Sequence, residues 1–315
     1  MGFDALLGNG RLKDNLTASL RQGKLAHFYV LSGPVGSGKQ TLARLLAAAA
    51  MCDGGKKPCL QCASCRKVLS QVHPDVITVS DPEHKTVPVR IIRQMRDDVF
   101  IRPNEGNKKV YIFPQEMGIE GQNALLKILE EPPSYGLFLL LTDNADKILP
   151  TVRSRSVELT LQPLEADLLE RVLEKEFPQA DRESIRAAMA RSGGFLGQAR
   201  ALLEAGMEEA PQTEAFITAL CTGDALLLTR TLVPLEKWKR DQLIPLLQQW
   251  TEILEGALAI RCGGQALSPL SARLAAARNG EMLLQAIEIL KKCTEYAQGN
   301  VSPAAICGYL QWTLR

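Results

Sequence analysis

Short apolar runs alternate with amphipathic helical segments through roughly the first half of the chain. Apolar runs of strand length occupy residues 28–32, 75–80, 109–113, 137–143 and 157–161. Helical spacing of apolar residues fills 38–50, 89–99 and 121–131 between them, and Pro132-Pro133 ends the last of these because proline lacks the amide donor that a helix needs. Strands that alternate with helices predict a five-stranded parallel α/β sheet with helices on both faces.

The strand pattern stops after Pro163, and the remaining pattern is helical. Helical segments are predicted at 164–176, 181–192 and 196–205, and a polar stretch at 204–215 is typical of a linker. A stripe of apolar residues from Leu243 to Leu258 follows the 3.6-residue period. We therefore predict three domains: an α/β domain at 1–162, a small helical domain at 163–207 and a larger all-helical domain at 208–315.

Composition and charge exclude only a few classes of protein. The chain has 315 residues, 46% of them hydrophobic and 23% charged, with a net charge of +2, so no strong basic field marks the whole chain as a nucleic-acid binder. The N-terminal stretch MGFDALLGNGRL lacks the basic and apolar regions of a signal peptide, and no apolar run is long enough to span a membrane. We predict a cytoplasmic protein without a membrane partner.

Residues 33–41, GPVGSGKQT, form a nearly complete phosphate-binding loop between a strand and a helix. The predicted phosphate-binding residues are Gly33, Gly36, Ser37, Gly38 and Lys39. Backbone N–H groups of such a loop point at phosphate oxygens, and the lysine reaches the terminal phosphates.

The position after the lysine departs from the motif. Gln40 stands where Ser or Thr would ligate magnesium, and Thr41 is rotated by about 100° on the helix. The strand at 109–113 runs into Pro114-Gln115-Glu116, so no aspartate follows it and Glu116 lies three residues beyond it. Because both magnesium supports are missing or displaced, we predict a degenerate site without hydrolysis. Whether ATP or ADP still binds is left open.

Four of the eight cysteines form a cluster: Cys52, Cys59, Cys62 and Cys65. Two-residue gaps let successive thiolates face one ion, and four thiolates fill a tetrahedral zinc shell, so we predict a structural zinc site. An iron–sulfur cluster with the same ligands stays open as an alternative. The other four cysteines, Cys221, Cys262, Cys293 and Cys307, are predicted to be small buried side chains.

Several segments of residues 3–156 resemble, in order, the bacterial clamp-loader ATPase family of AAA+ proteins. They are FDALLGNGRLKDNL, LAHFYVLSGPVGSGK, the four cysteines with HPDV, NALLKILEEPP and ILPTVRSRS. The resemblance implies an AAA+ P-loop domain with an inserted four-cysteine zinc module, a helical lid domain and an all-α collar domain. It also implies a heteropentamer with gamma/tau and delta subunits, which would act on a sliding clamp and primer-template DNA within the DNA polymerase holoenzyme.

The resemblance also assigns roles to single residues. Ser154-Arg155-Ser156 matches the family's Ser-Arg-Cys segment, which implies that Arg155 is an arginine finger acting in trans on a neighbouring ATP site. Arg153 is interpreted as an ordinary surface charge. Gly197 falls where active members place a lid arginine, Arg200 is out of register, and Thr142 at the phosphate-sensing position is predicted to be structural. We expect a non-hydrolysing ring subunit; the alternative is an active ATPase motor of the gamma/tau type with unusual magnesium ligands.

Overall fold

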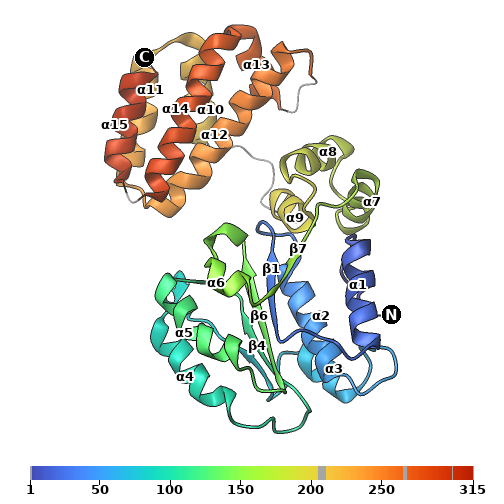
Figure 1. Cartoon of the computed structure of the whole chain (residues 1–315). Coiled ribbons are helices and arrows are strands. Elements are labelled where there is room, and N and C mark those ends of the chain that lie inside the picture. The colour runs from blue at the N-terminus through green and yellow to red at the C-terminus, as the bar shows by residue number, and fades with distance from the viewer. Residues whose placement is uncertain (1, 205–210, 265–267, 300, 315) are drawn as a thin grey trace. The chain divides into compact units, whose positions relative to one another are not determined.

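The computed structural model describes residues 2–204, 211–264, 268–299 and 301–314 (Figure 1). Its contacts divide the chain into two compact units. Unit 1 comprises Met1–Ala180 with Ser192–Ala201, and unit 2 comprises Asp181–Arg191 with Leu202–Arg315. Each unit is described by itself.

Unit 1 contains the predicted five-stranded parallel sheet. Its strands lie in the order β2-β4-β6-β1-β7, and each neighbouring pair is parallel. The strands are β1 (Phe28–Ser32), β2 (Val76–Thr78), β4 (Lys109–Phe113), β6 (Gly136–Thr142) and β7 (Val157–Thr160). The strand prediction is therefore confirmed, with ends shifted by one or two residues.

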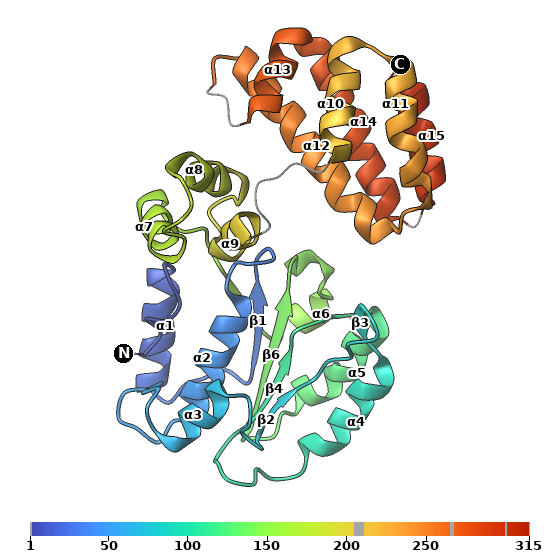
Figure 2. The same ribbon diagram turned by 180° about the vertical axis from the view of Figure 1, so that it is seen from behind.

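Residues at alternate positions of the central strands pack in two separate cores, one on each face of the sheet. Helices α1 (Gly10–Arg21) and α2 (Lys39–Met51) lie on one face of the sheet, and α4 (Val89–Val99) and α5 (Ile119–Glu130) lie on the other (Figure 2). Tyr29 and Leu31 of β1 pack in the core under α1 and α2, whereas Phe28 and Val30 pack in the core under α4 and α5. Because successive side chains of a strand point to opposite faces, continuous apolar runs such as FYVLS are what a doubly covered sheet requires. Both faces of the sheet are thus buried.

The helices of unit 1 follow the predicted alternation. They are α1 (Gly10–Arg21), α2 (Lys39–Met51), α3 (Ala63–Leu69), α4 (Val89–Val99), α5 (Ile119–Glu130), α6 (Pro150–Arg153), α7 (Ala166–Glu176) and α9 (Leu196–Glu204), with the 3-10 turn η1 at Ala145–Lys147. The sequence pattern does not predict helices α1, α3 and α6. It also does not predict a second, two-stranded parallel sheet, which pairs β3 (Thr86–Val87) with β5 (Glu116–Met117).

The described part of unit 2 is helical, as predicted. Its elements are α8 (Arg182–Arg191), α10 (Pro211–Thr222), α11 (Ala225–Leu232), η2 (Val233–Lys237), α12 (Arg240–Arg261), α13 (Pro269–Ala277), α14 (Gly280–Gln298) and α15 (Pro303–Thr313). The predicted apolar stripe lies on α12, where Trp250 stacks on Phe216 of α10 with ring centroids 3.7 Å apart. Among the described residues, no helix has the length and hydropathy needed to cross a membrane.

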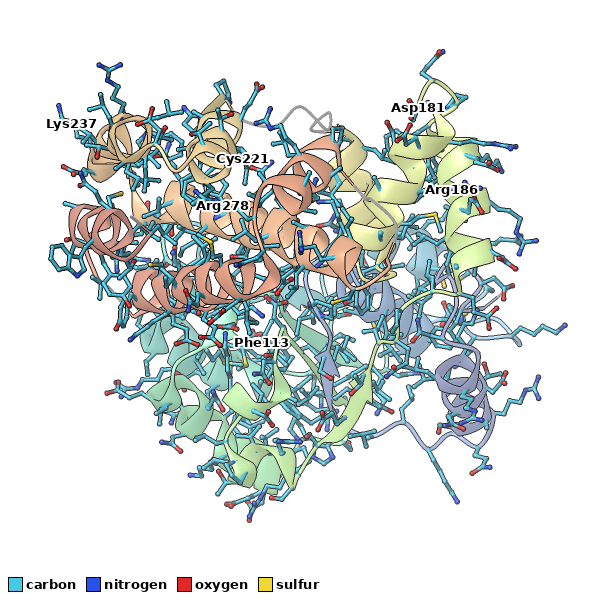
Figure 3. All side chains as sticks on the ribbon, turned by 90° about the horizontal axis from the view of Figure 1, so that it is seen from above. Phe113, Asp181, Arg186, Cys221, Lys237 and Arg278 are labelled. Atoms are coloured by element: carbon cyan, nitrogen blue, oxygen red, sulfur yellow. The ribbon has the colours of Figure 1, made fainter. Side chains whose placement is uncertain are left out.

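The prediction for the scattered cysteines is partly wrong. Cys293 and Cys307 are buried, but Cys262 is exposed. Cys221, which is labelled in Figure 3, is half-buried. Cys262 directly follows the last residue of α12. Near Cys221, the Nε of Arg278 donates to the carbonyl of Leu220 at 2.5 Å, which ties α10 to the end of α13.

The predicted linker is partly helical. Helix α10 begins at Pro211, because proline suits the first turn of a helix and Glu214 complements its N-terminus, so residues 211–215 are not linker. Glu204, the first residue of the predicted linker, is the last residue of α9. The other predicted linker residues, 205–210, and the boundary predicted between 207 and 208 lie outside the described residues. The boundary predicted between 162 and 163 stays a prediction.

Candidate functional site

The phosphate loop forms where the sequence predicts it, between β1 and α2. Gly36 and Gly38 have φ angles of +77° and +97°, which residues with a side chain rarely adopt, so glycine is required at both turns. Gly38 is the N-terminal cap of α2, and the loop lines a cavity of about 550 Å³. The loop is therefore shaped as a phosphate cradle at a helix N-terminus.

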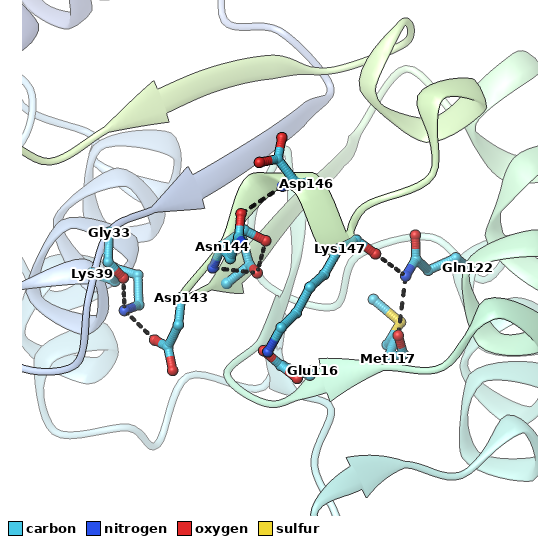
Figure 4. A network of polar contacts seen from close by, with 10 residues as sticks. Gly33, Lys39, Glu116, Met117, Gln122, Asp143, Asn144, Asp146 and Lys147 are labelled. Atoms are coloured by element: carbon cyan, nitrogen blue, oxygen red, sulfur yellow. Dashed lines mark hydrogen bonds and ion pairs between the residues drawn. The ribbon is translucent and has the colours of Figure 1, made fainter. Parts of the chain in front are cut away.

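Lys39 is already engaged within its own chain (Figure 4). Its Nζ donates to the carbonyls of Gly33 and Pro34, the latter at 2.9 Å, and forms an ion pair with Oδ1 of Asp143 at 2.7 Å. The side chain of Lys39 is only 11% exposed. Its ammonium therefore has a complete set of three acceptors without a ligand.

Gln40 and Thr41 both line the cavity but lie on the exposed side of the first turn of α2. A glutamine at this position offers one neutral amide oxygen where a hydroxyl would complete a compact magnesium shell. Gln40 also borders a second, smaller cavity of about 160 Å³ with Arg44.

The carboxyl end of β4 supplies no carboxylate to this cavity. Pro114 lines it, while the amide of Gln115 binds a neighbouring loop: its Oε1 accepts from the N–H of Asp81 at 2.7 Å and its Nε2 donates to the carbonyls of Asp81 and His84. Glu116 belongs to β5 and pairs with Lys147 at 2.7 Å (Figure 4). Neither Gln115 nor Glu116 lines the phosphate cavity.

The segment that begins α9 contacts the phosphate loop through backbone atoms. The N–H of Gly197 donates to the carbonyl of Gly36 at 3.0 Å, and a Cβ on Gly197 would lie 2.6 Å from the Cα of Gly36. Arg200, one turn later, lines the cavity but is bound by both carboxylate oxygens of Glu176 at 2.5 and 2.6 Å. The start of α9 thus brings a glycine backbone to the loop.

The four clustered cysteines come together at the end of α2 and the start of α3. Their Sγ atoms all lie within 4.8 Å of one another. The N–H of Gly54 donates to the Sγ of Cys52 at 3.3 Å, and the N–H of Cys62 donates to the Sγ of Cys59 at 3.3 Å. Four sulfur donors at this spacing, stabilised by backbone N–H groups, fit a structural zinc ion.

The thiols of this cluster differ in environment. Hydrogen bonds from the N–H groups of Gln61 and Cys62 lower the pKa of Cys59 to about 6. Burial raises the pKa of Cys52 and of Cys65. A buried thiolate needs a cation beside it, so a bound metal ion would supply what the two buried cysteines lack.

Arg155 lies at the surface, just after α6, and outside the phosphate cavity of its own chain. Its Nη2 pairs with Oε1 of Glu130 at 3.1 Å, and its Nη1 donates to the carbonyl of Thr151 at 3.0 Å and to the Oγ of Ser154 at 3.2 Å. Arg153 differs, because it pairs with two carboxylates, those of Asp146 and Glu158.

Two features of the site were not recognised in the sequence. One is Asp143, which directly follows β6. Strand β6 pairs with β1, and the phosphate loop begins at the end of β1. Since carboxyl ends of parallel strands meet at one edge of a sheet, the position of Asp143 was a readable signal. Glu130 as the partner of Arg155 had no such signal. Thr142 is buried and its hydroxyl donates to the carbonyl of Asn144 at 2.8 Å, in keeping with a structural role.

A parallel sheet whose strand β1 passes through a glycine-rich loop into α2 defines the class as a P-loop α/β protein. The family model described as "DNA polymerase III, delta subunit" matches residues 8–165, half of the chain. The chain belongs to this family.

Relatives among curated proteins carry related names. The DNA polymerase III subunit gamma of Buchnera aphidicola (subsp. Schizaphis graminum) is 32% identical over 213 residues, which cover 65% of this chain and 58% of that protein. The subunit delta' of Bacillus subtilis is 32% identical over 170 residues, covering 53% and 51%. The chain thus spans less than two thirds of the length of these relatives.

A solved structure of a DNA polymerase III gamma subunit-related protein from Thermotoga maritima covers 96% of this chain and 99% of its own. It is 17% identical in sequence, with a TM-score of 0.43, so the structural likeness carries no functional assignment.

Proposed function

We propose that the chain is a non-hydrolysing subunit of a DNA polymerase III clamp loader, of the delta-prime type. It braces the loader ring beside gamma/tau and delta subunits and lends Arg155 in trans to a neighbouring gamma/tau ATP site. The loader as a whole places the sliding clamp on primer-template DNA in the cytoplasm. This chain contributes to the polymerase holoenzyme without an ATPase activity of its own.

The observation that carries this proposal is the hydrogen bonding of Gln115 to a neighbouring loop. Hydrolysis in P-loop proteins needs acidic groups that hold magnesium and orient water. Here the residue that follows β4 and Pro114 is an amide bound to the loop at Asp81 and His84, and the next residue, Glu116, is paired with Lys147. Together with Gln40, this arrangement supports a phosphate loop that lacks the magnesium ligands of an active ATPase.

The contacts of Arg155 support the role of an arginine finger. Its side chain is 38% exposed and its guanidinium has one carboxylate partner, so a polyphosphate can replace that partner. Arg153 is held between two carboxylates of its own chain, which neutralise it more completely. Of the two arginines, Arg155 is therefore the better donor to a neighbouring site.

The four cysteines support a zinc module. Cys52, Cys59, Cys62 and Cys65 would hold one Zn²⁺ in a closed tetrahedral shell, which contributes folding energy and leaves no open position for catalysis. The ion would tie the end of α2 to the start of α3.

A second candidate function is an active ATPase of the gamma/tau type. The observation in its favour is the intact Gly33-x-x-x-x-Gly38-Lys39 loop beside a cavity of about 550 Å³, with the carboxylate of Asp143 at its edge. In that case Asp143 would have to serve as an unusual magnesium ligand.

ATP turnover by the purified chain with Mg²⁺ separates the two candidates. We expect no turnover above the Lys39→Ala variant. Turnover at a rate typical of motor subunits, abolished by Lys39→Ala, would contradict the non-hydrolysing role.

A loader reconstituted with gamma/tau and delta subunits tests the finger. Arg155→Ala should slow ATP hydrolysis at least about tenfold with assembly intact, because arginine fingers are worth about 10³–10⁵ in well-studied GTPases. Arg153→Ala is the matched control and should leave the rate nearly unchanged. Equal rates in wild type and Arg155→Ala would show that the finger assignment is wrong.

A further inference from the structure

The phosphate cavity contains cations, but each is already paired. Among the described residues that line it, the cationic side chains are those of Lys39 and Arg200. Lys39 pairs with Asp143 at 2.7 Å, and Arg200 pairs with Glu176 at 2.5 Å. The positive charge that a phosphate cradle normally offers to its ligand is therefore neutralised from within.

The two ion pairs differ in how closely they involve the phosphate loop. Arg200 lines the cavity from α9, and both it and its partner Glu176 on α7 are partly exposed. The side chain of Lys39 is 11% exposed, and its ammonium contacts two loop carbonyls besides the carboxylate of Asp143, so a ligand cannot recruit it without displacing Asp143. Asp143 is thus the decisive partner.

We propose that Asp143 is a specificity-determining residue of the phosphate loop: it acts as a built-in anion on Lys39 and excludes nucleoside triphosphates. This inference rests on the proposed function, which treats the loop as a cradle without hydrolysis, and it adds why the cradle does not fill with ATP. The cavity itself keeps room for a small ligand, at about 550 Å³.

The physical reason is a competition between two anions for one cation. Asp143 is attached to the sheet directly after β6, so its carboxylate is presented to Lys39 at a high effective concentration. An incoming polyphosphate must break that ion pair and then lie beside the released carboxylate, whose like charge repels it. The backbone contact between Gly197 and Gly36 holds the segment over the loop in place meanwhile.

Binding of ATP, ADP and adenosine to the purified full chain, measured by isothermal titration calorimetry without Mg²⁺, tests the inference. Asp143→Asn keeps the size of the side chain and removes its charge. We expect ATP to bind this variant at least about tenfold more tightly than wild type, since a hydrogen bond to a charged group changes affinity by about one to two powers of ten. Adenosine should bind both proteins within about twofold.

Two further variants show whether the gain acts through charge on Lys39. Asp146→Asn is the matched control, because Asp146 lies three residues later and pairs with Arg153 rather than Lys39, and it should give no gain. The double variant Lys39→Met/Asp143→Asn should lose the gain.

Each contrary outcome is distinct. An ATP affinity of Asp143→Asn within twofold of wild type, an equal gain for adenosine, or a gain that persists without Lys39 would each overturn the inference. The proposed function fails through a different result, which is Mg²⁺-dependent turnover by the wild-type chain. A missing gain without turnover therefore rejects the role of Asp143 alone.

Discussion

Gly36 and Gly197 touch through their backbones, although they lie 161 positions apart in the sequence. The N–H of Gly197 donates to the carbonyl of Gly36 at 3.0 Å, and a Cβ added to either glycine would lie 2.5–2.6 Å from backbone atoms around the other. The contact joins the phosphate loop to the start of α9. Gly197 stands where the resemblance leads one to expect an arginine. The close backbone contact with Gly36 gives a packing reason for glycine at this position.

Gly197→Ala should open this contact. Because backbone atoms cannot move aside as a flexible side chain can, we expect a loss of about 1–3 kcal/mol in the free energy of unfolding. Urea denaturation measures the loss, and limited proteolysis should cleave near α9 more readily. Gly10→Ala, whose Cβ would meet nothing within 4 Å, is the control and should be neutral. Equal stability of both variants would contradict the importance of the contact.

Asp75 should make stability depend on acidity. It is fully buried; burial opposes its ionisation, but hydrogen bonds from the N–H groups of Asn104, Glu105 and Gly106 outweigh burial and lower its pKa. A lowered pKa contributes stability above the unfolded value near 3.8, and this contribution is lost as the pH falls through the folded pKa.

Asp75→Asn should therefore cost about 2–3 kcal/mol at pH 7, because hydrogen bonds to a charged group are lost in a buried site. Urea denaturation between pH 7 and 3 should show the difference from wild type shrinking at the acid end. Asp97→Asn, at an 81% exposed side chain, is the control and should run parallel to wild type. A constant gap across this range would contradict the role of ionised Asp75.

Removal of the proposed zinc ion should unfold the four-cysteine module locally. We expect elemental analysis to return about one zinc per chain, and a strong chelator to lower the melting temperature. Cys62→Ser should lose the metal, whereas Cys262→Ser, at the exposed cysteine, should retain it. A brown, iron-containing preparation would show instead that the four thiolates hold an iron–sulfur cluster.

Glu130 should restrain Arg155. The carboxylate holds the guanidinium against its own chain, so Glu130→Gln frees it for a neighbouring phosphate. Exposed ion pairs are worth up to about 1 kcal/mol, and an arginine finger acts on the transition state, which predicts a roughly two- to fivefold higher rate of ATP hydrolysis in the reconstituted loader. Glu131→Gln, exposed and next in sequence, is the control. A lower rate in Glu130→Gln would show that the carboxylate assists the finger instead.

Much of unit 1 was predictable because its signals are local. Continuous apolar runs located the five strands of the main sheet, and helical spacing with the paired prolines located α2, α4 and α5 between them. The small sheet of β3 and β5 was missed because each strand has only two residues, too few for a periodic pattern. The prediction that Cys262 is buried was wrong because burial depends on where a helix ends in the tertiary structure. The residues next to it in the sequence do not reveal this.

The sequence alone determined the phosphate loop, the absence of an aspartate directly after β4 and the cysteine spacing, because each depends on residues close together in the chain. The tertiary structure decided how these parts are used. It placed Asp143 on Lys39, Gly197 on Gly36 and Glu130 on Arg155, and it gave the amide of Gln115 to a distant loop. Such contacts join residues 25 to 161 positions apart, so only the folded arrangement of strands and helices could show them.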